Sequence, residues 1–164
     1  MQKTWNYLFY STWKLHNRAS EIFIFPLIFI FNKISFFRKN WHSKGEEEYN
    51  RIIKSKDLGL NVLFSYYCML MTTSIIYSVF FMYVWYALQI EVGNNIYYYF
   101  IAVVVLSYLT NEILSWRKDV YLKYFTEFDK VNNKSLIYLP AILFHLGVAV
   151  FAVLSIHWTI GFSF

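Results

Sequence analysis

Residues 60–90, LNVLFSYYCMLMTTSIIYSVFFMYVWYALQI, contain no formally charged side chain over 31 positions. A helix needs roughly 20 apolar residues to cross a hydrocarbon core about 30 Å thick. This stretch therefore predicts a membrane-spanning helix. Residues 96–116, with one acid, and residues 136–160, with none, meet the same criterion.

The composition of the whole chain agrees with this prediction. Hydrophobic residues make up 58% of the 164 positions and charged residues only 15%, whereas soluble domains have about 45–50% and about 25%. Too few polar residues remain to cover the surface of a soluble enzyme. We expect an all-α integral membrane protein that forms a single domain over residues 1–164 and is surrounded by a lipid bilayer.

The distribution of positive charge predicts the orientation. No Lys or Arg occurs between Asp57 and Trp116, and basic residues gather before the first span and between the second and third. The positive-inside rule therefore places residues 38–57 and 117–135 in the cytoplasm and the C-terminus outside. The net charge of +5 then reflects topology and does not indicate nucleic-acid binding. Abundant Phe, Tyr, Ile, Asn and Lys suggest an AT-rich genome, hence a bacterial inner membrane, or alternatively an organellar one.

The amino-terminal region predicts two further membrane-associated segments. In residues 1–20, one approximate helical face carries Trp5, Leu8, Phe9, Trp13 and His16, which suits an amphipathic helix lying in the interface, with Asn6 elsewhere. Residues 22–37 are apolar but contain Pro26, and as a helix they reach only about 24 Å. We therefore favour a short interfacial or re-entrant element over a fourth span.

Both predicted cytoplasmic segments have helical patterns. Residues 38–57 predict a linker helix with a capping box of Ser43 and Glu46 and a Glu47–Arg51 pair. Residues 117–135 predict a helix followed by a turn, and the helix carries an apolar stripe. Two alternatives remain for this stripe: it packs within the chain, or it forms a partner surface. Its members are Val120, Tyr121, Tyr124, Phe125 and Phe128.

Polar residues inside the spans are the candidate functional residues, because ionisable groups are costly in a membrane. His145 lies near the middle of the third span, and we expect it to form an interhelical hydrogen bond with the cluster of Thr72, Thr73 and Ser74. Asn111 is a second candidate for polar packing. Glu112, near the cytoplasmic end of its span, is expected to be hydrated or paired with Lys118. Proton or ligand handling by His145 and Glu112 stays open as an alternative.

The sequence carries no recognisable catalytic or cofactor motif. A single cysteine, Cys68, excludes an internal disulfide and a cysteine-based metal site. His145 and His157 are separated by about 18 Å along one helix, so they cannot share a haem iron. Metalloprotease, hydrolase and phosphate-loop signatures are missing. We expect a protein that is not an enzyme and has no cofactor and no metal.

Two segments carry a resemblance to a known group. The resemblance is carried by YLFYSTWKL at residues 7–15 and by RKDVYLKYFTEFDK at residues 117–130, which a final span follows. Through these segments the chain resembles small three-span inner-membrane proteins of AT-rich bacteria. Some of these are similar to immunity proteins against polymorphic toxins. Residues 21–57 depart from that layout by being longer and more apolar. The resemblance implies neutralisation of a membrane-acting toxin by direct binding, and it transfers no site residues.

Two other functions fit the same features. The chain could be an accessory subunit of a larger membrane complex, for example a respiratory one. It could also be a channel or transporter subunit that uses His145 and Glu112 and forms a homo-oligomer, because three spans are few to enclose a pore. Each hypothesis predicts another membrane protein or another copy of the chain as the partner.

Overall fold

The computed structural model describes residues 1–32, 46–57, 59–89, 96–130 and 137–161, and these residues form helices joined by short turns, with no β-strand among them. The elements follow one another as α1 (Gln2–Asn32), α3 (Glu46–Tyr49), η2 (Asn50–Lys54), α4 (Leu60–Leu88), α5 (Ile96–Asn111), η4 (Glu112–Trp116), η5 (Arg117–Asp119), α6 (Val120–Asp129) and α7 (Leu139–Gly161).

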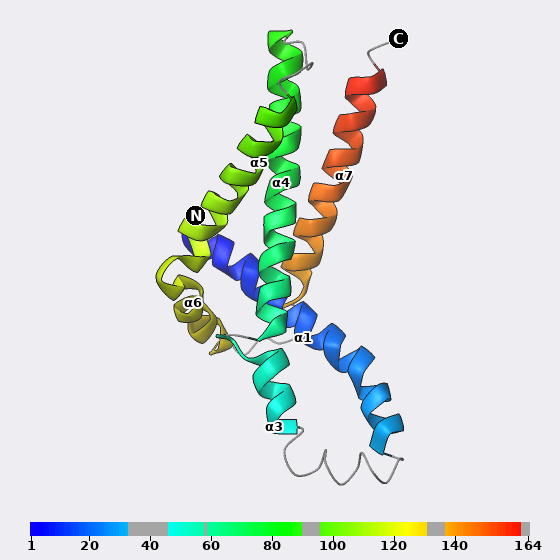
Figure 1. Cartoon of the computed structure of the whole chain (residues 1–164), viewed down its shortest axis with the longest axis vertical. Coiled ribbons are helices and arrows are strands. Elements are labelled where there is room, and N and C mark those ends of the chain that lie inside the picture. Colours follow the sequence, from blue (N-terminus) through cyan, green and yellow to red (C-terminus); the bar gives the residue numbers. More distant parts are fainter. Residues whose placement is uncertain (33–45, 58, 90–95, 131–136, 162–164) are drawn as a thin grey trace.

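Three helices are long and apolar enough to cross a membrane: α4, the helix that begins with α5, and α7. This confirms the three predicted spans. In Figure 1, α4 runs between the other two: α5 lies to its left near the base and meets it toward the upper end, and α7 lies beside it near the base and leans away toward the upper end. α4 packs against both α5 and α7. The chain is therefore a multi-pass membrane protein by the length and composition of its helices.

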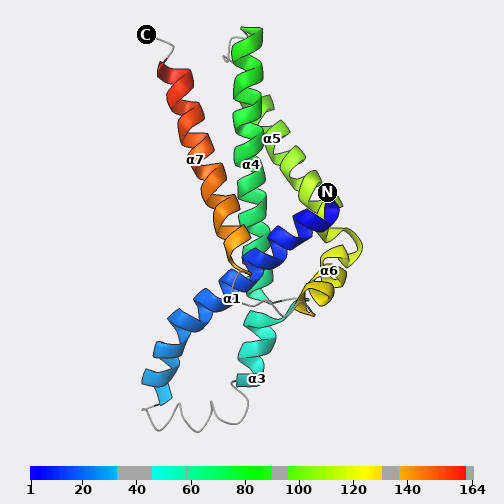
Figure 2. The ribbon, with the colours of Figure 1, turned by 180° about the vertical axis from the view of Figure 1, so that it is seen from behind.

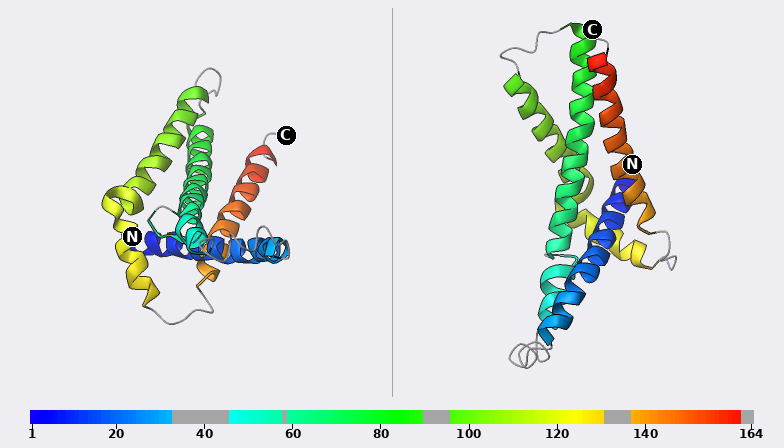
Figure 3. Two further views of the ribbon diagram at one scale, coloured as in Figure 1. Left: turned by 60° about the horizontal axis from the view of Figure 1, so that its bottom comes forward. Right: turned by 90° about the vertical axis from the view of Figure 1, so that its right-hand side faces the viewer.

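Helix α1 is continuous over 31 residues and crosses the base of the three long helices (Figures 2 and 3). We predicted a break between residues 1–20 and 22–37, whereas the helix runs through position 26 to Asn32. Residues 33–37 lie outside the described part. α1 is not among the described helices that qualify as spans. It contacts α4, α6, α7 and η4 and so joins every part of the base.

The chain turns sharply between α5 and α6. The last turn of the second span is a π-helix, η4, followed by the short 3-10 turn η5. Lys118 and Asp119 have φ angles of 56° and 53°, a left-handed conformation that costs non-glycine residues about 1–3 kcal/mol. This turn directs α6 away from the line of α5 and toward α1 (Figure 1).

The linker region differs in detail from the prediction. Glu46–Lys54 is helical as α3 and η2, but Ser43 of the predicted capping box lies outside the described residues. Arg51 is 4.0 Å from Glu48, one position away from the predicted partner Glu47. Lys54 is 2.7 Å from Glu21 and thereby ties η2 to α1.

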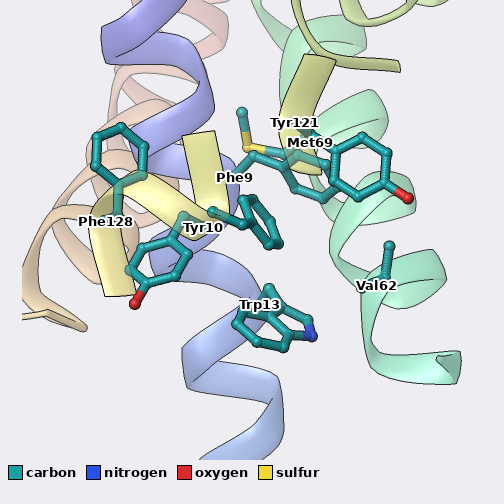
Figure 4. Close-up of a cluster of buried hydrophobic side chains, with 8 residues drawn as sticks. Phe9, Tyr10, Trp13, Val62, Met69, Tyr121 and Phe128 are labelled. Carbon is teal, nitrogen blue, oxygen red and sulfur yellow. The ribbon is translucent and has the colours of Figure 1, made fainter. Parts of the chain in front are cut away.

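The buried core lies between α1 and α6 and is mainly aromatic (Figure 4). Phe125 of α6 is fully buried, and the centre of its ring lies 5.2 Å from that of Phe9 and 5.1 Å from that of Trp13, both on α1. α4 contributes Val62 and Met69 to the same cluster. Aromatic side chains bury large apolar areas, so this contact attaches α6 to the underside of α1.

Candidate functional site at the junction of α1, α4 and α7

His145 lies where three helices meet. Its Nδ1 atom is 2.7 Å from the hydroxyl oxygen of Thr72 on α4, and its Nε2 atom is 3.0 Å from the hydroxyl oxygen of Thr12 on α1. The contact with Thr72 is the one predicted from the sequence. The contact with Thr12 was not predicted, because nothing in the sequence shows that α1 reaches the third span.

The hydrogen bonds around His145 can be counted in full. The hydroxyl proton of Thr72 goes to the carbonyl oxygen of Cys68, and that of Thr12 goes to the carbonyl oxygen of Leu8, both at 2.8 Å. Each hydroxyl has one proton, so in this arrangement both threonines offer only lone pairs to the imidazole. A doubly protonated ring satisfies both. A neutral ring donates from one nitrogen to one of the two threonines. The second threonine must then turn its hydroxyl proton from the backbone carbonyl to the other ring nitrogen.

A second histidine, His16, connects α1 to α4 one helical turn further along. Its Nδ1 atom is 2.8 Å from the hydroxyl oxygen of Ser65, whose own proton goes to the carbonyl oxygen of Asn61 at 2.6 Å. His16 therefore donates through Nδ1 to Ser65. Its Nε2 atom then accepts from the thiol of Cys68, with 3.7 Å between nitrogen and sulfur. Burial lowers the pKa of His16 below its ordinary value, which favours this neutral form.

These contacts form one continuous polar seam along α1. At one end Asn61 donates to the side-chain oxygens of Asn17, at 2.7 Å, and Ser20, at 3.1 Å. On the side toward α7, Ser11 donates to the carbonyl oxygen of Ile137 and accepts from the backbone N–H of Ala141. We use the name polar seam for the set Ser11, Thr12, His16, Asn17, Ser20, Asn61, Ser65, Cys68, Thr72 and His145.

Ion pairs fasten the outer edge of the same junction. Asp129, at the end of α6, accepts from Tyr10 at 2.6 Å and pairs with Lys14 at 2.8 Å and with Lys56. Burial, followed by the bond to the Asp129 carboxylate, raises the pKa of Tyr10 well above its ordinary value. On the other side of α1, hydrogen bonding from Lys54 lowers the pKa of Glu21. Tyr10 therefore stays neutral and Glu21 stays ionised at neutral pH.

The other predicted intramembrane residues lie outside the polar seam. Asn111 is buried and donates to the hydroxyl oxygen of Thr73 at 2.9 Å, which joins α5 to α4. Glu112 is half-buried in η4, and the ion pairs of the described residues include none between it and Lys118. His145 and Glu112 are on helices that each pack against α4, and the structure brings them into no shared site.

The apolar stripe of α6 packs within the chain. Tyr121, Phe125 and Phe128 are buried against α1 and its neighbours, and Val120 and Tyr124 are half-buried. The first of our two alternatives therefore describes this conformation, and α1 covers most of the predicted partner surface.

The sequence of α4 carries a signal for the polar seam. Asn61, Ser65, Cys68 and Thr72 recur every three or four positions and form one polar stripe on an otherwise apolar helix. Such a stripe requires a polar partner inside the membrane. Thr12 and His16, four residues apart on α1, are that partner.

The chemistry available at the seam is hydrogen bonding and proton exchange between hydroxyl, imidazole and thiol groups. Among the described residues, no group of three or more His, Cys, Asp or Glu side chains is placed to hold a metal ion. No family model matches the chain, and neither does any curated protein or solved structure with which it was compared.

Proposed function

We propose that this protein is a non-enzymatic membrane protein that acts by binding another membrane protein. Its most concrete role, suggested by the layout of its sequence, is the neutralisation of a membrane-acting toxin. The binding surface that we propose is the lipid-facing side of α7 around Gly147, on the helix that leans away from α4 toward the C-terminal end (Figure 1).

The single observation that carries this proposal is the environment of Gly147. Gly147 is exposed in the middle of α7, and a Cβ atom added to it would meet no atom within 4 Å other than its chain neighbours and the backbone of its own helix. No contact within the described part of the chain therefore requires a glycine there, although glycine in a helix interior costs about 0.5–1 kcal/mol relative to alanine. Small residues in membrane helices allow a partner backbone to approach closely. A partner helix seated against Gly147 explains the residue.

The surroundings of Gly147 fit such a partner. Leu143, Leu146 and Val150 are exposed at 61%, 59% and 57% on the same helix. Helix association in membranes depends on close van der Waals packing, and an apolar surface around a small residue provides it. The polar groups of the seam are already hydrogen-bonded inside the chain, so they do not compete for the partner.

The test is protection of cells that express a candidate membrane-acting toxin, taken from the genes that flank this one. Wild-type protein should restore growth and should be recovered with the toxin from solubilised membranes. Gly147→Leu should abolish both, because its side chain keeps the partner backbone away. Ala87→Leu, at an exposed small residue near the end of α4, is the matched control and should protect fully.

Absence of protection by wild-type protein contradicts the toxin role. The accessory-subunit hypothesis makes a different prediction, that the chain purifies in a multi-protein assembly without any toxin. If Gly147→Leu breaks that assembly while Ala87→Leu does not, the binding surface stands and the partner is a complex subunit. If neither variant changes any interaction, the proposed surface is wrong.

A further inference from the structure

We propose that η5 and α6 present a basic face that binds the headgroups of anionic phospholipids in the bilayer leaflet at the base of the molecule. The basic face consists of Arg117, Lys118, Lys123 and Lys130. All four side chains are exposed. In the part of the chain that the structure describes, none of them forms an ion pair with a carboxylate.

The other described cations differ from these four, because each has a carboxylate partner. The pairs are Lys3 with Glu127, Lys14 and Lys56 with Asp129, Arg18 and Lys54 with Glu21, and Arg51 with Glu48. Both carboxylates of α6 are thus neutralised by lysines from other elements. Asp119 is the one acid left on η5 and α6, so the free charge of this region is clearly positive.

Packing determines the direction in which the basic face points. The aromatic residues of α6 are buried against α1, and this contact fixes the rotation of α6 about its axis. Lys123 and Lys130 are seven residues apart, so they lie on one side of the helix about 10 Å from each other. That side is turned away from the buried core.

The position of the face favours lipid as its occupant. Arg117 directly follows Trp116, which ends the second span, and tryptophan is typical of headgroup depth. The cations therefore begin at the level where lipid phosphates are most concentrated. Anionic headgroups attract lysine and arginine near the surface. The basic face is separate from the surface around Gly147, so either proposal can fail without the other.

The test measures which lipid lies next to α6. A fluorophore is attached at Thr126→Cys, an exposed position on α6, in a Cys68→Ser background, and the protein is reconstituted into phosphatidylcholine vesicles containing some phosphatidylglycerol. Quenching by nitroxide-labelled phosphatidylglycerol should exceed quenching by nitroxide-labelled phosphatidylcholine several-fold. High salt should reduce the difference, because exposed charges are screened.

Two double variants separate the basic face from net charge alone. Lys123→Gln with Lys130→Gln should remove most of the several-fold preference for phosphatidylglycerol. Arg18→Gln with Arg51→Gln removes the same charge from exposed but paired residues and should leave the preference nearly unchanged. Circular dichroism confirms that both variants are folded.

Three results would overturn the proposal. The first is equal quenching of wild-type protein by the two lipids. The second is an equal loss of preference in both double variants, which would show a response to net charge. The third is displacement of phosphatidylglycerol from α6 by a soluble polyglutamate peptide at a concentration lower than that of the phosphatidylglycerol. This result would identify an acidic protein as the occupant.

Discussion

The aromatic contact between α1 and α6 should be the main source of stability at the base, and Phe125→Ala tests it. Phe125 is completely buried, and the centre of its ring lies 5.2 Å from those of Phe9 and Tyr10 and 5.1 Å from that of Trp13. All three partners are on α1. Truncation at Phe125 therefore removes contacts between the two helices and leaves the polar seam untouched.

The expected loss follows from the burial of the ring. Replacing a fully buried phenylalanine with alanine costs about 3–5 kcal/mol in folded cores. The lower end of this range applies here, because lipid headgroups can cover part of the aromatic surface that is exposed when α1 separates from α6. A loss of about 3 kcal/mol corresponds to an increase of more than a hundredfold in the population with α1 undocked.

Amide hydrogen exchange of residues 6–13, measured by mass spectrometry in lipid nanodiscs, reports this population. In Phe125→Ala these amides should exchange at least about a hundredfold faster, because a helix without its packing partner is marginal in water. Thr126→Ala, at the exposed neighbouring position, should leave the rates unchanged. A change below about tenfold in Phe125→Ala, or an equal change in Thr126→Ala, would show that the aromatic contact does not hold α1 in place.

Three further predictions concern the polar groups. Burial lowers the pKa of His16, so docking of α1 should be strongest above the ordinary histidine pKa of about 6.5 and should weaken as the pH falls below it. The same hydrogen-exchange assay should show no such pH dependence in His16→Gln. His145→Leu should lower the free energy of unfolding by about 1–2 kcal/mol, because two interhelical hydrogen bonds are lost. His157 is exposed, so His157→Leu should change this free energy by less than about 0.5 kcal/mol. Reversible unfolding in mixed micelles measures both values. Asn111→Leu should cost about 1 kcal/mol, and in the same assay a double-mutant cycle with Thr73→Val should attribute most of that loss to their shared bond.

The three spans could be predicted from sequence because hydropathy is a local property. The contact between His145 and Thr72 could be predicted for a related reason. A polar group within a span needs a partner of similar depth, and residues of both kinds were visible on the helices that contain them. The pair formed by Asn111 and Thr73 follows the same logic.

The position of α1 could not be predicted in this way. Its apolar residues suggested a face with Trp5 and Leu8, whereas the buried side also includes Asn6 and Tyr10, each at most 1% exposed. Asn6 can be buried because its amide donates to the carbonyl oxygens of Gln2 and Leu114 at 2.9 and 2.7 Å. The bond to Leu114 forms only when α1 contacts the end of the second span. The choice of the helix against which α1 packs is therefore a property of the assembled fold.

The two sides of α1 have different physical roles. Its aromatic side, toward α6, provides apolar area, which favours contact but tolerates small shifts along the helix. Its polar side, toward α4 and α7, tolerates none, because a shift of one helical turn, about 5.4 Å, would separate Thr12 from His145 and His16 from Ser65. Unpaired polar groups in an apolar environment are expensive. We infer that aromatic packing holds α1 at the base and that the polar seam selects its register, so a variant with an altered seam should remain docked in a shifted or mixed position.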